Sequence, residues 1–173
     1  WYEGAGIYRH VWLVKKSPVH IAYNGTWVKP RKMEGDKWRV EVETRLENSF
    51  EFDTDFSVRT TLMAPDGSTL ETVETSSDVK GFGTTTILQI AEVQNPALWS
   101  VETPQMYEAL TEVIGQDGSA DYLRTPFGFR TIRMDADTGF WLNGENIKLK
   151  GFCNHQDHAG VGVAVPYAIK EYR

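Results

Sequence analysis

Apolar and polar residues alternate along most of the chain between residues 19 and 133. The clearest run places an apolar or threonine side chain at every second position: Trp38, Val40, Val42, Thr44 and Leu46. The intervening positions are all charged: Arg39, Glu41, Glu43 and Arg45. Because successive side chains of a strand point to opposite faces, this run predicts a β-strand with one buried and one wet face.

Several other segments show the same period of two or are rich in β-branched residues. They are 19–28, 56–62, 70–73, 84–90, 107–113, 120–123 and 128–133. Asn24-Gly25 predicts a bulge or turn within the first of them, Pro65-Asp66-Gly67 predicts a turn, and the polar run 75–81 predicts a loop. About seven strands with turns at this spacing predict an all-β fold, an immunoglobulin-like β-sandwich.

The two ends of the chain show different patterns. Residues 6–14 are largely apolar on both faces of a predicted strand. This favours a position covered on both sides, at a junction between domains, and the alternative is an edge strand of one sandwich. Two apolar runs flank Asn143-Gly144, which suits a type I′ turn, so residues 140–149 predict a β-hairpin. Pro166 predicts the start of a helix, and the sequence ends only about two turns after it. Because the first residue is also not Met, we expect a piece of a longer protein.

Composition limits the kind of protein that this can be. The 173 residues are 40% hydrophobic, enough for one well-packed domain with a small appendage. The net charge of −6 argues against a nucleic-acid partner, because no basic stripe is present to replace phosphate counterions. No apolar run approaches the roughly 20 residues that span a bilayer, so we expect a soluble protein without a membrane partner. The compartment stays open between bacterial periplasm and cytoplasm.

Polar side chains crowd together where the hairpin's second strand is expected to end. They are Cys153, Asn154, His155, Gln156, Asp157 and His158. A strand end fixes such groups and the following loop leaves them reachable, so this cluster is a candidate ligand site. A metal site or a Cys153 nucleophile would each need a further residue from elsewhere. We therefore expect no metal and no cofactor in this chain, and a buried, inert Cys153.

Four short motifs occur in order along the chain. They are Gly4-Ala-Gly-Ile-Tyr-Arg-His-Val-Trp12, Pro96-Ala-Leu-Trp-Ser-Val-Glu-Thr-Pro104, Pro126-Phe-Gly-Phe-Arg-Thr-Ile132 and Leu149-Lys-Gly-Phe-Cys-Asn-His-Gln-Asp-His158. Together they resemble glycoside hydrolase family 2, especially its β-galactosidases. Enzymes of that family contain a jelly-roll sugar-binding domain, an immunoglobulin-like sandwich and a (β/α)8 catalytic barrel, in that order.

The resemblance implies where this chain falls in such an enzyme. Residues 1–14 would end the jelly-roll domain, residues 15–133 would form the sandwich, and residues 134–173 would form the hairpin and the beginning of a truncated barrel. The family's retaining mechanism uses two glutamates on later barrel strands, beyond Arg173. The resemblance therefore implies a non-catalytic structural domain whose partners are the remaining domains of its parent and a terminal β-linked sugar.

His155 aligns with the family's histidine that contacts the substrate sugar, and Asn154 and Asp157 are its neighbours in the motif. An imidazole can donate to a sugar hydroxyl, and such bonds can tighten in the transition state. The better-known β-galactosidase pattern has Arg at the position of Asn154 and an acidic residue at that of Gln156. β-Galactosidase, β-glucuronidase and β-mannosidase relatives therefore all remain open, with β-galactosidase favoured.

Tryptophans raise an alternative function. They include Trp27, Trp38, Trp99 and Trp141. An exposed indole face can pack against a sugar, so a carbohydrate-binding module, or an adhesion-type sandwich, is the alternative to a hydrolase domain. Trp38 is in phase with a buried strand face, and we expect most of these side chains to lie in the core.

Overall fold

The computed structural model describes residues 6–116, 118, 120–153 and 157–172. The chain divides into two compact units, Lys16–Lys148 and a smaller one made of Trp1–Lys15 with Leu149–Arg173. In the described part of the chain, no helix has both the length and the apolar character needed to cross a membrane.

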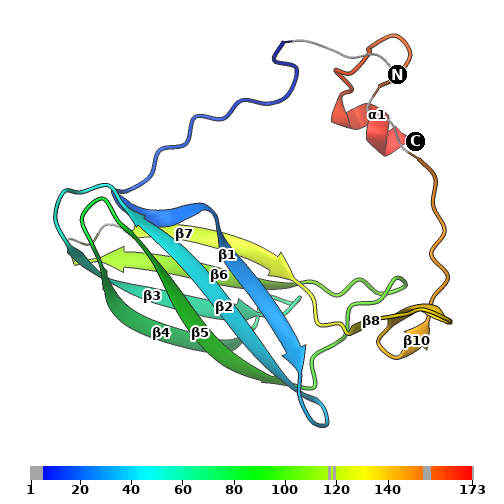
Figure 1. The fold of residues 1–173 in the computed structure, drawn as a ribbon, viewed down its shortest axis with the longest axis horizontal. Coiled ribbons are helices and arrows are strands. Elements are labelled where there is room, and N and C mark those ends of the chain that lie inside the picture. The colour runs from blue at the N-terminus through cyan, green and yellow to red at the C-terminus, as the bar shows by residue number, and fades with distance from the viewer. Residues whose placement is uncertain (1–5, 117, 119, 154–156, 173) are drawn as a thin grey trace. The chain divides into compact units, whose positions relative to one another are not determined.

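Seven strands of the larger unit form two antiparallel sheets that face each other (Figure 1). One sheet contains β1 (Val19–Lys32), β2 (Lys37–Asn48) and β5 (Thr84–Gln94), in the order β1-β2-β5. The other contains β3 (Thr54–Met63), β4 (Thr69–Val79), β6 (Tyr107–Gly115) and β7 (Ala120–Phe127), in the order β4-β3-β6-β7. The predicted all-β sandwich is confirmed. It differs from the constant-type immunoglobulin arrangement because the fourth strand pairs with the third rather than joining the first sheet.

The inward side chains of both sheets form two apolar clusters. The first contains Trp38, Val40, Val42, Leu62, Ala91, Val93, Tyr107, Ala109, Phe127 and Phe129. The second contains Val19, Ile21, Leu46, Phe56, Val58, Val79, Ile87 and Val113. The alternation predicted for β2 is confirmed, since Trp38 is 2% exposed and Leu46 is fully buried. Burial of these side chains supplies most of the driving force for folding.

A polar layer separates the two clusters. Four strands each place one buried polar residue at the inward position between the clusters. These residues are Thr44 on β2, Gln89 on β5, Thr60 on β3 and Thr111 on β6. The Thr60 hydroxyl donates to Gln89 Oε1 at 2.7 Å and lies 3.2 Å from the Thr111 hydroxyl. Gln89 Nε2 donates across the core to the carbonyl of Val58 at 2.9 Å. These bonds connect the two sheets, because Gln89 is on β5 and its partners are on β3.

Strand β4 is longer than predicted, and the loop expected at residues 75–81 is wrong for residues 75–79, since only Lys80 and Gly81 lie outside the strand. Residues 69–79 pair with β3, down to Thr54 opposite Val79. The error has a physical cause, because β4 is an edge strand whose outer positions are exposed. Polar residues satisfy such positions, and backbone pairing needs no apolar side chain.

Strand β1 contains the bulge predicted at Asn24-Gly25. Its register with β2 shifts between Ile21 and Thr26, and Asn24 has a positive φ of 51°. A Cβ on Gly25 would lie 2.7 Å from the carbonyl oxygens of Ala22 and Arg45, so only glycine fits this turn of the strand.

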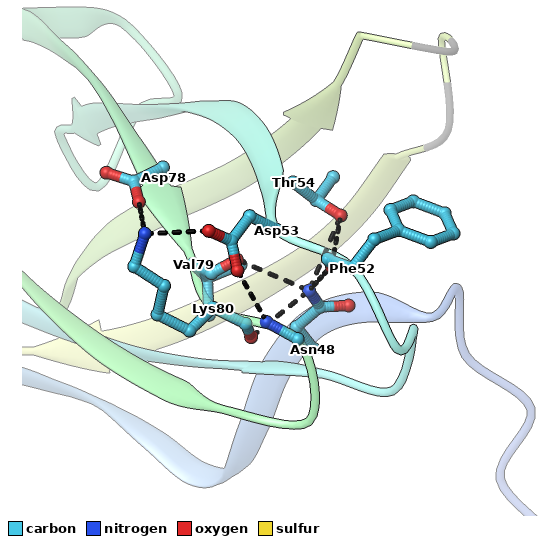
Figure 2. A network of polar contacts seen from close by, with 8 residues as sticks. Asn48, Phe52, Asp53, Thr54, Asp78, Val79 and Lys80 are labelled. Atoms are coloured by element: carbon cyan, nitrogen blue, oxygen red, sulfur yellow. Dashed lines mark hydrogen bonds and ion pairs between the residues drawn. The ribbon is translucent and has the colours of Figure 1, made fainter.

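Asn48, at the end of β2, ties the following loop to the turn between β4 and β5 (Figure 2). Its Nδ2 donates to the carbonyl of Phe52 at 2.9 Å, and the carbonyls of Val79 and Lys80 lie at 3.3 Å. Its Oδ1 accepts the amide N–H of Phe50 at 2.9 Å. Asn48 is 3% exposed, so a buried amide with both ends satisfied fixes this corner of the sandwich.

A glycine and a lysine complete the same corner. A Cβ on Gly81 would lie 2.2 Å from the carbonyl oxygen of Glu51, which no side chain could occupy. Lys80 Nζ lies 2.7 Å from Asp53 Oδ2 and 3.4 Å from Asp78 Oδ2 (Figure 2). The hydrogen bond from Lys80 lowers the pKa of Asp53 and correspondingly raises the pKa of Lys80. These groups are exposed, so solvent screens the ion pair and it stabilises the fold only weakly.

Three short strands form a separate antiparallel sheet after the sandwich. They are β8 (Ile132–Asp135), β9 (Gly139–Leu142) and β10 (Glu145–Asn146), in the order β10-β9-β8. The predicted turn is confirmed, since Asn143 and Gly144 have φ of 52° and 85°, as a type I′ turn requires. The strand predicted at 128–133 belongs in part to this small sheet, and the strand predicted to continue to residue 149 ends at Asn146.

The smaller unit contradicts one strand prediction and confirms a helix. Residues 7–17 form no strand, and Val11 and Leu13 are 75% and 101% exposed. A strand needs a neighbour to accept its backbone hydrogen bonds, and the described residues offer none there. Helix α1 (Tyr167–Tyr172) begins directly after Pro166, as predicted.

Candidate functional site

Residues 147–153, which lead from the hairpin to the segment predicted to bind a ligand, form neither helix nor strand. Leu149 and Phe152 are 68% and 103% exposed, and Cys153 is exposed as well. The prediction of a buried strand cysteine is therefore wrong, because no strand forms at this position and nothing described covers it. Asn154 and His155 lie outside the described residues, so only Asp157 of the three predicted sugar contacts can be placed.

Asp157 is half-buried and directly precedes a closed turn. The amide of His158 donates to the carbonyl of Gly162 at 3.0 Å, and the amide of Gly162 donates back at 2.9 Å. His158 Nδ1 lies 2.7 Å from the carbonyl oxygen of Ala159. Among the residues that the structure describes, no three His, Cys, Asp or Glu side chains are grouped as metal ligands would be.

The smaller unit brings the first sequence motif against the start of helix α1. The His10 ring stacks on the Tyr167 ring, with centroids 5.7 Å apart and planes 18° apart. A cavity of about 310 Å³ lies beside them, lined by Tyr8, Arg9, His10, Ala164, Val165, Pro166 and Tyr167. The structure thus joins residues from both ends of the chain in one aromatic contact.

Two other sequence motifs meet at the end of the sandwich. Leu98 and Phe129 form an isolated parallel bridge, and the Trp99 amide donates to the Phe129 carbonyl at 2.8 Å. A Cβ on Gly128 would lie 3.0 Å from the Cβ of Trp99, so glycine allows the two segments to approach closely. Phe129 is fully buried and anchors this contact in the first apolar cluster.

Asn143 fastens the hairpin to the same place. Its Nδ2 donates to the carbonyl of Trp99 at 3.0 Å, and its Oδ1 accepts the amide N–H of Thr131 at 2.9 Å. Its own amide donates to the carbonyl of Thr131 at 2.9 Å. One residue at the tip of the hairpin therefore extends the β8–β9 ladder by two hydrogen bonds to Thr131 and makes one hydrogen bond to Trp99, in the segment between β5 and β6. We call Trp99, Thr131 and Asn143 the joint.

A groove lies beside the joint. Its volume is about 450 Å³, and it is lined by Val28, Pro30, Trp99, Met106, Pro126, Phe127, Gly128, Arg130 and Ile132. The guanidinium of Arg130 lies over the Trp99 ring, 4.7 Å from its centroid. The groove is therefore apolar with a single cation at its wall, which is a common composition for a small-ligand site.

The turn between β8 and β9 contains the most strongly shifted carboxyl group near the joint. Asp135 Oδ1 accepts the hydroxyl and amide hydrogens of Thr138 at 2.7 and 2.8 Å. These bonds, with the Asp137 amide and nearby Arg133, lower the pKa of Asp135 from 3.8 to about 2. Asp135 is thus a fixed carboxylate that shapes the turn and is unsuited to proton transfer at neutral pH.

No local sequence pattern predicts the joint or the groove. The Asn143-Gly144 turn alone accounts for an asparagine at this position, so the sequence gives no sign that its side chain also makes long-range contacts. Trp99 and Arg130 are 31 positions apart, and no local periodicity relates them. The signal that could have found them is that both belong to sequence motifs shared with one family.

Comparison with known proteins agrees with the fold. The family model described as glycosyl hydrolases family 2 matches residues 19–130. A β-galactosidase of Bacteroides ovatus is 33% identical over 95% of this chain and 19% of its own length. A putative β-glucuronidase of Formosa agariphila is 34% identical over 95% of this chain and 15% of its own length.

A solved structure gives the same result. A glycosyl hydrolase family 2 member from Bacteroides cellulosilyticus superimposes with a TM-score of 0.89 at 30% identity, covering 99% of this chain and 24% of that protein. The chain thus spans about a fifth of the length of such relatives. On the match to residues 19–130, the chain belongs to glycosyl hydrolase family 2.

Proposed function

We propose that this chain is a non-catalytic structural domain of a retaining family 2 glycosidase, with a β-galactosidase as the parent. Its relatives named as glycosidases are about five times as long, so most of such an enzyme lies outside this stretch. Glycoside hydrolysis by the retaining route needs two carboxyl groups about 5–5.5 Å apart. We place that pair outside residues 1–173.

The joint is the observation that carries this proposal. A support domain must hold the next segment in a fixed place. Asn143 donates one hydrogen bond to Trp99 of the sandwich and two further bonds join it to Thr131, at the start of β8. The hairpin leads directly into residues 149–158. We assign residues 1–14 to a preceding sugar-binding domain, residues 15–133 to the sandwich, and residues 134–173 to the hairpin and the beginning of the barrel.

The sugar contacts are the second part of the proposal. His155 would donate to a hydroxyl of the terminal sugar, with Asn154 and Asp157 beside it. Relatives carry the names β-galactosidase and β-glucuronidase, so the substrate class is a terminal β-glycoside with either a neutral or an acidic sugar. We favour the β-galactoside, and the remaining domains of the parent would complete the pocket.

Hydrolysis assays of the chain test the proposal. We expect no release of nitrophenol from nitrophenyl β-galactoside or β-glucuronide, with a full-length family 2 β-galactosidase as the positive control. Turnover by this chain that survives repurification and disappears on heat denaturation would contradict the proposal, because the reacting carboxyls would then lie within residues 1–173.

A carbohydrate-binding module remains the second candidate, because of Trp27. This side chain is 63% exposed on the outer face of the first sheet, whereas Trp38 is buried. An exposed indole can stack on a sugar. Saturable quenching of tryptophan fluorescence by polysaccharide, lost in Trp27→Ala and kept in Trp12→Ala, would favour this function over the structural one.

A further inference from the structure

Three tryptophans of the larger unit have a cation over the indole ring. Lys29 lies over Trp27 at 4.5 Å, Arg133 over Trp141 at 4.4 Å and Arg130 over Trp99 at 4.7 Å. Such stacking holds the cation in one orientation, and a stacked guanidinium keeps the N–H groups at its edge free to donate. The three pairs are therefore comparable local arrangements.

Two of the three cations also have a carboxylate partner. Lys29 pairs with Glu43, and Arg133 pairs with Asp135 at 2.9 Å. For Arg130, no described carboxylate lies within ion-pair distance, although the chain as a whole is acidic. Arg130 is thus an oriented guanidinium whose donors have no acidic partner among the described residues.

The surroundings of Arg130 also differ from those of the other two cations. It lines the groove of about 450 Å³, and none of the other lining residues is charged. Pro30, Met106 and Ile132 supply apolar walls beside it. A ligand that suits this groove has a carboxylate for Arg130 and a compact body with C–H groups for the walls.

We propose that this groove binds the carboxylate of a uronic acid glycoside, at a site separate from the one that cleaves the substrate. This inference rests on the proposed carbohydrate function, which supplies a sugar as the ligand; the acidic sugar is inferred from Arg130 and is independent of the β-galactoside favoured for the cleavage site. The sugar carboxylate accepts two hydrogen bonds from the Arg130 edge, and the ring packs on Pro30 and Met106. Trp99 positions Arg130 from behind without contacting the carboxylate.

Binding titrations with two matched glycosides test the site. Methyl β-glucuronide and methyl β-glucoside differ only in the group attached to ring carbon C5. The glucuronide has a carboxylate there, and the glucoside has a hydroxymethyl group. The groove is open to solvent, which screens the ion pair between Arg130 and the sugar carboxylate. We therefore expect the glucuronide to bind only about fivefold more tightly than the glucoside. The readout is the NMR shift of the Trp99 indole N–H in the whole chain.

Variants assign the effect to the stacked guanidinium. Arg130→Gln and Arg130→Lys are both expected to remove the preference, since Lys keeps the charge but lacks the planar fork. Arg133→Gln is the matched control, because that arginine stacks on a tryptophan but already pairs with Asp135. It is expected to leave the preference unchanged.

Three results would overturn the proposed uronic acid site. Equal binding of the two glycosides overturns it, and so does a preference that survives in Arg130→Gln. Acetate competing as well as the glucuronide overturns the assignment to a sugar, because the site would then bind any carboxylate. None of these results depends on hydrolysis, so they leave the proposed structural role to its own assay.

Discussion

The side-chain amide of Asn143 donates to the main-chain carbonyl of Trp99 at 3.0 Å, across 44 positions of sequence. Asn143 also occupies the first central position of the turn between β9 and β10, at a φ of 52°. One residue therefore shapes the hairpin and fastens it to the sandwich. These two tasks can be separated by substitution, because glycine adopts the same φ without a side chain.

Asn143→Gly is expected to keep the turn and release the hairpin from the sandwich. The Thr131 amide loses its acceptor and the Trp99 carbonyl loses its donor, which should lower the free energy of unfolding by about 1–3 kcal/mol. Urea denaturation measures this loss, and hydrogen exchange should accelerate at the Thr131 amide. Asn146→Ala is the control, because its exposed amide bonds only to Phe140 and to Thr138 in the turn before β9, and not to the sandwich. Equal exchange rates in Asn143→Gly and the unsubstituted chain would contradict the joint.

Gln89→Ala is expected to destabilise the sandwich strongly. It removes the Gln89 bonds to the Thr60 hydroxyl, which keeps only Thr111 as a side-chain partner, and to the Val58 carbonyl, and it opens a cavity between the apolar clusters. The combined loss should be about 2–5 kcal/mol, measured by urea denaturation. Gln94→Ala, on the exposed end of the same strand, should change stability by less than about 0.5 kcal/mol. A small effect at position 89 would mean that water replaces the amide.

Asn48→Asp changes one buried donor group into a carboxylate oxygen. That oxygen would face the carbonyls of Phe52, Val79 and Lys80, to which Asn48 now donates (Figure 2). We expect a loss of about 3 kcal/mol or more at neutral pH, because the buried charge keeps only the Phe50 amide as a donor while its other oxygen faces carbonyl oxygens. Protonation of the new acid should recover part of the stability as the pH is lowered. Asn95→Asp is the exposed control, and an equal loss there would contradict the role of Asn48.

Asp135 should titrate well below other carboxyl groups. Its pKa of about 2 lies below the ordinary 3.8, so the ionised form is the one that stabilises the turn. This stabilisation is complete above pH 3.8 and is lost as the pH falls through 2. NMR titration of the Asp135 side-chain carbonyl should give a midpoint near 2, and Thr138→Val should raise it. A midpoint near 3.8 in the unsubstituted chain would show that the Thr138 hydrogen bonds do not form.

The sequence predicted those elements whose pattern is local. Strand β2 alternates over its whole length, and Asn143-Gly144 is nearly sufficient to define its turn. Strand β4 was mostly missed because its polar edge looks like a loop, and pairing with β3 rather than burial makes it a strand.

The candidate site was harder to predict because its contacts are long-range. The resemblance predicted Asn154, His155 and Asp157 as sugar contacts, and of these only Asp157 lies within the described residues. The joint forms only when Trp99 and Asn143 come into contact, and the sequence around neither residue indicates that it contacts the other. The strand predicted at residues 6–14 was wrong because an apolar pattern supplies no hydrogen-bonding neighbour.

Residual dipolar couplings measure whether the sandwich holds its hairpin rigidly. Amides of β8 and β9 and amides of β2 and β3 should fit one alignment tensor with equal magnitude, since the joint leaves no independent motion. In Asn143→Gly the hairpin couplings should shrink while those of the sandwich stay the same. Couplings that already require a separate or reduced tensor for the hairpin in the unsubstituted chain would contradict the account.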